Sequence, residues 1–158
     1  LSLGSNIDRQ HNIGSGLDDL AAAFGELRLS PVYESEAVGF KGSPFFNLVV
    51  ALETDLPVAE LADRLRDIER APGRVRGEKT FASRTLDIAI LPYGDLTGEF
   101  DGVSLPRDEI LKHAFVLRPL ADLAPDACHP SLNKTYAELL EEYPFPEQRL
   151  SVVRFDWP

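Results

Sequence analysis

The sequence is poor in sulfur and has no long apolar run. Among 158 residues there is one cysteine, Cys128, and no methionine. A single cysteine excludes an internal disulfide and a site of several thiolates, and it suits a reducing compartment. No stretch approaches the roughly 20 apolar residues of a membrane span, and the first residues do not resemble a signal peptide. We therefore expect a cytoplasmic protein with no membrane partner.

Positive charge is also scarce. The chain has 16 lysines and arginines against 26 acids, a net charge of −10. This charge would repel a nucleic-acid backbone, so we predict no nucleic-acid partner, whereas a small anion in a local basic pocket remains compatible. With 44% hydrophobic side chains, the length suits one core, and we expect a single domain over residues 1–158 and a monomer.

The histidines do not indicate a separate metal site. None of the three forms a recognised metal-binding motif with another histidine or with an acid. We therefore expect them at the surface or beside a nucleotide. They are His11, His113 and His129.

The hydrophobic pattern predicts the order strand, helix, strand, strand, helix, strand. The expected strands are residues 1–3, 27–33, 46–52 and 85–91, and the expected helices are 12–24 and 57–71. Residues 4–6 are expected to form a turn. This order predicts an α+β ferredoxin-like sandwich, an antiparallel sheet with two helices on one face. The last third should be a C-terminal elaboration with a strand at 103–105, an apolar run at 115–117 and a helix at 136–140.

The segment from Pro72 to Arg84 is long for a helix-to-strand connection, and long connections are often functional. Its charged residues are Arg74, Arg76, Lys79 and Arg84 against Glu78. One guanidinium group can donate two parallel hydrogen bonds to phosphate oxygens, so the segment is typical of a lid over a polyphosphate. A solvated loop whose arginines pair with the many acids is the alternative.

The strand after this segment contains one acid. Alternation places Leu86, Ile88 and Ile90 on one face and Asp87 and Ala89 on the other. A buried or half-buried aspartate there needs a hydrogen-bonding partner or a cation. A metal ligand and an ion pair with a nearby arginine are both open interpretations.

Several short motifs follow one another along the chain. They are Gly4-Ser5-Asn6, the strand around Asn47, Arg74-Val75-Arg76, Ser83-Arg84-Thr85-Leu86-Asp87-Ile88, Phe115-Val116-Leu117-Arg118-Pro119-Leu120 and Ala124-Pro125. Together they resemble the 6-hydroxymethyl-7,8-dihydropterin pyrophosphokinase family of folate biosynthesis, over nearly the whole chain. The resemblance implies an ATP-dependent diphosphotransferase that uses magnesium. It would move the β,γ-diphosphate of ATP to the hydroxymethyl oxygen of the pterin and release AMP.

The resemblance also implies roles for individual residues. The pterin would stack between Phe45 and Phe115, with Asn47 and the backbone near Ser35 and Val38 bonded to its polar edge. The catalytic residues would be Arg74, Arg84 and Asp87, and Asp87 would also bind magnesium. ATP would be held by Glu69, Arg76, Phe81, Arg84, Ile88, Arg107 and His113.

The chain departs from the family pattern at several positions, including Ser35 where the family usually has threonine and Glu36 where it usually has proline. A second family aspartate falls on Ala89, a family histidine on Arg107 and a family arginine on His113. Two carboxylates at i and i+2 lie about 6 to 7 Å apart and suit a metal pair, although one carboxylate can hold one magnesium ion. Three alternatives stay open: an active pyrophosphokinase, a protein that binds a pterin or nucleotide with weak or no turnover, and a diphosphokinase for a different pterin.

Overall fold

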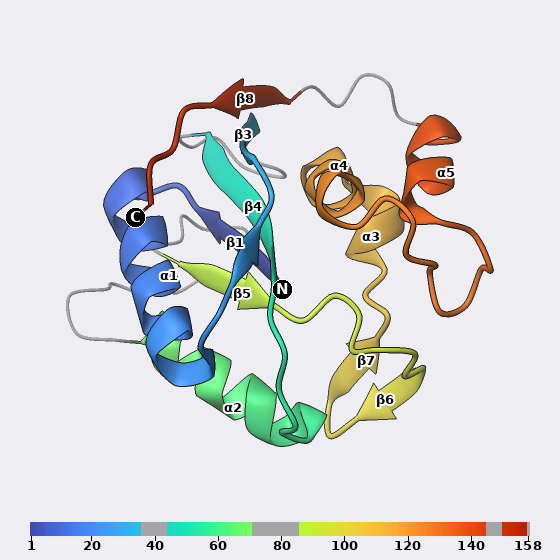
Figure 1. Ribbon diagram of the computed structural model, residues 1–158, viewed down its shortest axis with the longest axis horizontal. Helices are drawn as coiled ribbons and strands as arrows, with labels where there is room; N and C mark the ends of the chain where they lie inside the picture. Colours follow the sequence, from blue (N-terminus) through green and yellow to red (C-terminus); the bar gives the residue numbers. More distant parts are fainter. Residues whose placement is uncertain (36–43, 71–85, 145–149, 158) are drawn as a thin grey trace.

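The computed structural model describes residues 1–35, 44–70, 86–144 and 150–157 (Figure 1). Within them, the main sheet has the strand order β5-β1-β4-β3-β8, and β2 also pairs with β4. Every pairing in it is antiparallel. Its strands are β1 (Ser2–Ser5), β2 (Arg28–Leu29), β3 (Val32–Ser35), β4 (Phe45–Ala51), β5 (Asp87–Ala89) and β8 (Ser151–Val153).

The first two thirds of the chain confirm the predicted fold class. The first helix, α1 (Arg9–Phe24), follows β1, and the second, α2 (Val58–Glu69), leads towards β5. The order β5-β1-β4-β3 places the last core strand beside the first, as in a ferredoxin-like sandwich. Gly25 ends α1 at a φ of 84°, and its N–H donates to the carbonyl of Ala21 at 2.9 Å.

One core lies between the sheet and the two helices α1 and α2. The predicted apolar face of α2 is buried at Leu61, Leu65 and Ile68, and α1 contributes fully buried leucines and Ile13. From β5, the side chain of Ile88 enters the same cluster. The apolar helix faces that repeat every 3.6 residues therefore pack against the apolar strand face that repeats every two residues, and together they form one core layer.

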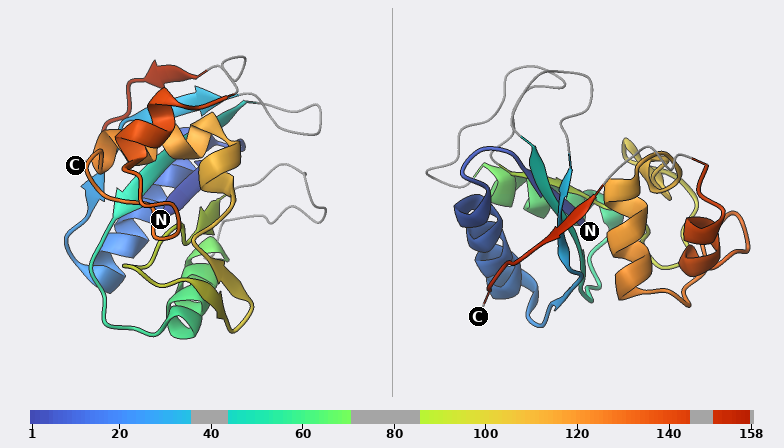
Figure 2. Two further views of the ribbon diagram at one scale, coloured as in Figure 1. Left: turned by 90° about the vertical axis from the view of Figure 1, so that its right-hand side faces the viewer. Right: turned by 90° about the horizontal axis from the view of Figure 1, so that it is seen from above.

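The C-terminal third covers the other face of the sheet. Figure 2 shows the sheet between α1 and α2 on one side and α4 (Ala114–Leu123) and α5 (Tyr136–Glu141) on the other. A second apolar cluster joins Val49 of β4 to Leu117 and Leu120 of α4. The prediction of helices on one face was therefore incomplete, because the apolar run at 115–117 is the start of a helix that packs on the sheet.

Several boundaries differ from the predicted ones. The strand expected over residues 27–33 is two strands, because Ser30 and Pro31 interrupt it. The Ser30 hydroxyl accepts the Val49 N–H at 2.9 Å, and the Ser30 N–H donates to the Val49 carbonyl at 2.9 Å. The turn expected at residues 4–6 was wrong in part, since Gly4 and Ser5 belong to β1.

The remaining described elements are short. They are β6 (Gly98–Phe100), β7 (Val103–Leu105) and α3 (Glu109–Lys112). The strand predicted at 103–105 is confirmed, and it pairs with β6 in a hairpin that the sequence pattern did not indicate. In the part of the chain that the structure describes, every helix is too short or too polar to cross a membrane.

Candidate functional site

A row of residues runs across the sheet on the side that α4 covers. Gly4 of β1 pairs with Asp87 of β5 on one side and with Asn47 of β4 on the other. Residues directly opposite in antiparallel strands point to the same face. Because neighbouring strands are about 4.8 Å apart, the backbones of Asp87 and Asn47 are separated by roughly 10 Å, with Gly4 between them.

The Asn47 end of this row is buried and fixed. Asn47 is 5% exposed and Ser35 6%. The Ser35 hydroxyl donates to Asn47 Oδ1 at 2.7 Å, so the amide nitrogen is the group left to donate. Phe45, opposite Ser35 in the β3–β4 register, is half-buried at the same end of β4. The fold thus brings together three of the residues predicted to bind the pterin.

The Asp87 end of the row is open to solvent. Alternation along β5 is confirmed, because Leu86, Ile88 and Ile90 are buried while Asp87 is exposed. The requirement that a buried or half-buried aspartate would have for a partner or a cation therefore does not apply to Asp87. Among the described residues, no group of three or more histidine, cysteine, aspartate or glutamate side chains is arranged to hold a metal ion.

Arg107 lies near Asp87 and is held by Glu109. Arg107 Nε lies 3.1 Å from Glu109 Oε2, and its terminal nitrogen lies 3.2 Å from Oε1. The Glu109 hydrogen bonds are the main cause that raises the Arg107 pKa, and the charge of Asp87 adds to them. In turn, the bonds from Arg107 lower the pKa of Glu109. This paired geometry fixes the plane of a guanidinium group close to the exposed carboxylate.

His113 and Phe115 stack at the start of α4. Their ring centroids are 4.7 Å apart and their planes differ by 16°. Burial lowers the pKa of His113. The histidine predicted to contact ATP is therefore in direct contact with the phenylalanine predicted to contact the pterin.

Glu69 ties the end of α2 to β5. Its Oε2 atom accepts the N–H of Ile88 at 2.8 Å. This bond holds the backbone next to Asp87, a structural task that the sequence did not indicate. Nucleotide contacts of Glu69 and Ile88 stay predictions.

Five of the predicted site residues lie outside the described residues. They are Val38, Arg74, Arg76, Phe81 and Arg84. Their proposed roles rest on the sequence alone.

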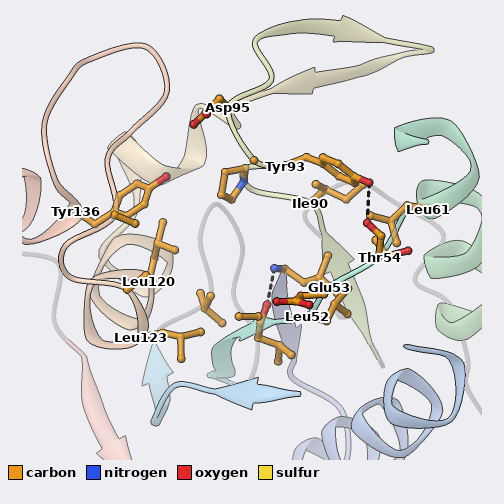
Figure 3. Close-up of a pocket in the computed structure, with 18 of the residues that line it drawn as sticks. Leu52, Glu53, Thr54, Leu61, Ile90, Tyr93, Asp95, Leu120, Leu123 and Tyr136 are labelled. Atoms are coloured by element: carbon orange, nitrogen blue, oxygen red, sulfur yellow. Dashed lines mark hydrogen bonds between the residues drawn. The ribbon is translucent and has the colours of Figure 1, made fainter. Parts of the chain in front are cut away.

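A cavity of about 660 Å³ lies elsewhere, between the end of β4, the residues after β5 and the C-terminal helices (Figure 3). Tyr93 lies along one side of it, and its hydroxyl donates to the Leu56 carbonyl at 2.6 Å. The charged side chains that line it are all acidic: Glu53, Asp55 and Asp95. These charges disfavour a triphosphate, and no predicted site residue lines this cavity.

Comparison with known proteins decides the family. Residues 1–125 match the family described as 7,8-dihydro-6-hydroxymethylpterin-pyrophosphokinase. The chain belongs to this family. A 2-amino-4-hydroxy-6-hydroxymethyldihydropteridine pyrophosphokinase of Pseudomonas aeruginosa is 39% identical over 150 residues, which are 92% of this chain and 91% of the relative. A protein with the same name from Synechocystis is 37% identical, over 83% of this chain and 71% of the relative. Another from Aquifex aeolicus is 32% identical, over 90% of this chain and 89% of the relative.

The matched region contains every residue that the resemblance to the pyrophosphokinase family assigned to the site. Sequence reasoning missed two neighbours of those residues, Gly4 as the centre of the row and Glu109 as the partner of Arg107. A signal existed for Gly4, because a glycine inside a strand often marks a close approach of another group. Nothing in the sequence indicated the Arg107–Glu109 pair, since acids are common throughout the chain.

Proposed function

We propose that this pyrophosphokinase-family protein transfers the diphosphate of ATP to 6-hydroxymethyl-7,8-dihydropterin. The observation that carries the proposal is the row in which Asn47 and Asp87 share one face of the sheet on either side of Gly4. In this reaction the hydroxymethyl oxygen of the pterin attacks the β-phosphorus of ATP. The bond from that phosphorus to the oxygen bridging it to the α-phosphorus breaks, AMP leaves with that oxygen, and the hydroxyl group loses its proton.

The Asn47 end would bind the pterin. A flat heterocycle needs fixed hydrogen-bonding groups at its edge and apolar surfaces on its faces. The buried Asn47 amide, fixed by Ser35, supplies an oriented N–H donor, and Phe45 lies at the same end of β4. We assign Phe115 to the second ring surface, supported by its position at the start of α4 beside His113.

The Asp87 end would bind the phosphates through magnesium. Magnesium prefers oxygen ligands and often uses only one or two protein carboxylates, with water and phosphate oxygens completing its shell. The exposed carboxylate of Asp87 fits that role, whereas a site made of protein ligands alone does not fit the described residues. When bound, the ion would neutralise charge on the phosphate oxygens.

Cationic side chains would complete the phosphate site. Arg107, held in plane by Glu109 near Asp87, would face the nucleotide. We assign Arg74 and Arg84 to the growing charge on the transferred group, on the sequence resemblance alone. Such charges stabilise a transition state most when they are fixed beforehand.

Ala89 supports a second candidate function, a protein that binds the pterin or the nucleotide with little turnover. It pairs with Ser2 in the register and lies on the same strand face as Asp87, where the family pattern has a second carboxylate. Without that oxygen ligand, a second metal ion would be held less well. A protein that binds the pterin or the nucleotide with little turnover is therefore the second candidate. The third is a diphosphokinase for a different pterin, which the sequence favours through Glu36 and the exchanged cations at Arg107 and His113.

The deciding experiment measures AMP release from ATP, magnesium and 6-hydroxymethyl-7,8-dihydropterin. We expect turnover by the unmodified chain and a loss of roughly 100-fold or more in Asp87→Ala, because a bound metal supplies several kcal/mol of transition-state stabilisation. Ala89→Asp should turn over at least as fast as the unmodified chain. A silent chain that gains activity only with Ala89→Asp would favour the binding protein, and turnover that is unchanged in Asp87→Ala would refute the role of this residue.

We also propose that the protein works as a single-domain monomer in the cytoplasm without a nucleic-acid partner. The net charge of −10 supports the last point. Sedimentation at several protein concentrations tests the monomer, since a mass that doubles with concentration would contradict it.

A further inference from the structure

We propose that Gly4 is a positioning residue for pterin binding, because only a residue without a side chain lets the Asn47 carboxamide lie over β1. This inference rests on the proposed function and adds a residue to it. Gly4 is paired on both sides in the sheet. Its backbone is not among the positive-φ glycines, which are Gly25, Gly94, Gly98 and Gly102 in the described residues. Space, rather than backbone freedom, is therefore the reason for glycine at this position.

The space above Gly4 is occupied by the amide group. A Cβ atom on Gly4 would lie 2.9 Å from Asn47 Nδ2 and 3.7 Å from Phe45 Cδ1. The first of these separations is shorter than a van der Waals contact between carbon and nitrogen. A methyl group there would push the amide away from β1, and the displaced side chain would have to give up its hydrogen bond from Ser35.

The orientation of the amide is fixed from its other side. Ser35 donates to Oδ1 at 2.7 Å, so Nδ2 carries the two remaining donors. Within the described part of the chain, Ser35 is the one hydrogen-bond partner found for the Asn47 side chain, which is 5% exposed. Buried donors are rarely left without an acceptor. The geometry therefore calls for an acceptor atom on a ligand, above Gly4 and between Asn47 and Asp87.

The test compares Gly4→Ala, Asn47→Ala and the double variant with the unmodified chain. Calorimetric titration gives the affinity for 6-hydroxymethyl-7,8-dihydropterin and, separately, for α,β-methylene-ATP with magnesium. Gly14→Ala is the matched control, because a Cβ atom there meets no atom within 4 Å. We expect Gly4→Ala to weaken pterin binding roughly three- to tenfold, the value of a lost hydrogen bond. Nucleotide affinity should stay unchanged, since the nearest atoms to the added methyl all belong to β4.

The double variant separates positioning from a general effect on folding. In Asn47→Ala the amide is gone, so adding Gly4→Ala should cause no further loss of pterin affinity. Additive losses would overturn the inference, as would equal losses for both ligands or no loss in Gly4→Ala. If Gly4→Ala alone does not fold, the double variant must fold, because the space is then vacant; its failure to fold would also overturn the inference. An unmodified chain that binds neither ligand would instead overturn the proposed function.

Discussion

At the scale of single residues, Asn47 and Asp87 have opposite environments although both are assigned to one site. Asn47 is buried and held by Ser35, whereas Asp87 is exposed. An amide that recognises the edge of a rigid ring needs a fixed direction. A carboxylate that binds a hydrated cation can remain in water until the ion arrives, which avoids the cost of burying its charge.

His129 shows what the sequence pattern could not indicate about a single residue. It was expected at the surface or beside a nucleotide, but it is 5% exposed. Its Nδ1 atom accepts the N–H of Ser131 at 3.1 Å. Its ring lies edge-on to the ring of Tyr136, with the two ring centroids 6.4 Å apart. These contacts require the neutral ring with a free acceptor at Nδ1.

Stability should therefore fall in mild acid. Burial lowers the His129 pKa in the folded protein, whereas an unfolded histidine titrates near about 6.5. Below that pH the unfolded chain takes up the proton first, so the free energy of unfolding decreases until the pH reaches the folded pKa. Urea denaturation between pH 7 and pH 5 should show a smaller decrease in His129→Gln. The same slope in both proteins would contradict this assignment.

At the scale of elements, α1 contains two glycines with different surroundings. A Cβ atom on Gly14 would meet nothing within 4 Å, whereas one on Gly16 would lie 2.7 Å from Leu86 Cδ2. Gly14→Ala should raise the free energy of unfolding by about 0.5 to 1 kcal/mol, because alanine loses less backbone entropy in a helix. Gly16→Ala should lower it by about 1 to 3 kcal/mol through overpacking. Chemical denaturation of the two variants measures both values, and a change of the same sign in both would refute the packing argument.

The contact between the sheet and α4 depends on a buried hydroxyl group. Tyr33 of β3 is 4% exposed, and its hydroxyl donates to Asp122 Oδ2 on α4. Burial is the main cause that raises the Tyr33 pKa, and the bond to Asp122 adds to it. Arg118 Nε lies 3.6 Å from the other oxygen of Asp122.

Removing this hydroxyl should loosen the second layer of the fold. We expect Tyr33→Phe to lower the free energy of unfolding by about 1.5 to 3 kcal/mol, the range for a hydrogen bond to a charged group. Tyr143→Phe is the matched control, since its hydroxyl donates at the surface to the Lys112 carbonyl and its loss should cost less. Urea denaturation compares the two variants, and equal losses would contradict the special role of the Tyr33–Asp122 bond.

At the scale of the whole molecule, ligand binding should stabilise the fold by mass action. Magnesium with α,β-methylene-ATP at about 100 times its dissociation constant should raise the free energy of unfolding by about 2.7 kcal/mol. The melting temperature of the unmodified chain should rise accordingly. At the same ligand concentration Asp87→Ala should show a smaller rise, because its affinity is lower. An equal rise in both proteins would exclude Asp87 from the metal site.

The sequence by itself determined the core elements and the family. The buried faces of α1, α2 and β5 are readable because their apolar period matches the period of a helix or a strand. The family follows from several motifs in one order, and the order of core elements restricts the sheet to few topologies.

Only the tertiary structure decided how this site is assembled. Asn47, Gly4 and Asp87 are far apart in the chain, and strand register alone makes them neighbours on one face. The exposure of Asp87 and the burial of His129 depend on which segments cover them. The helical packing of α4 on the second face depends on contacts with a strand more than 60 residues earlier. Such contacts join residues distant in sequence, so no local pattern contains them.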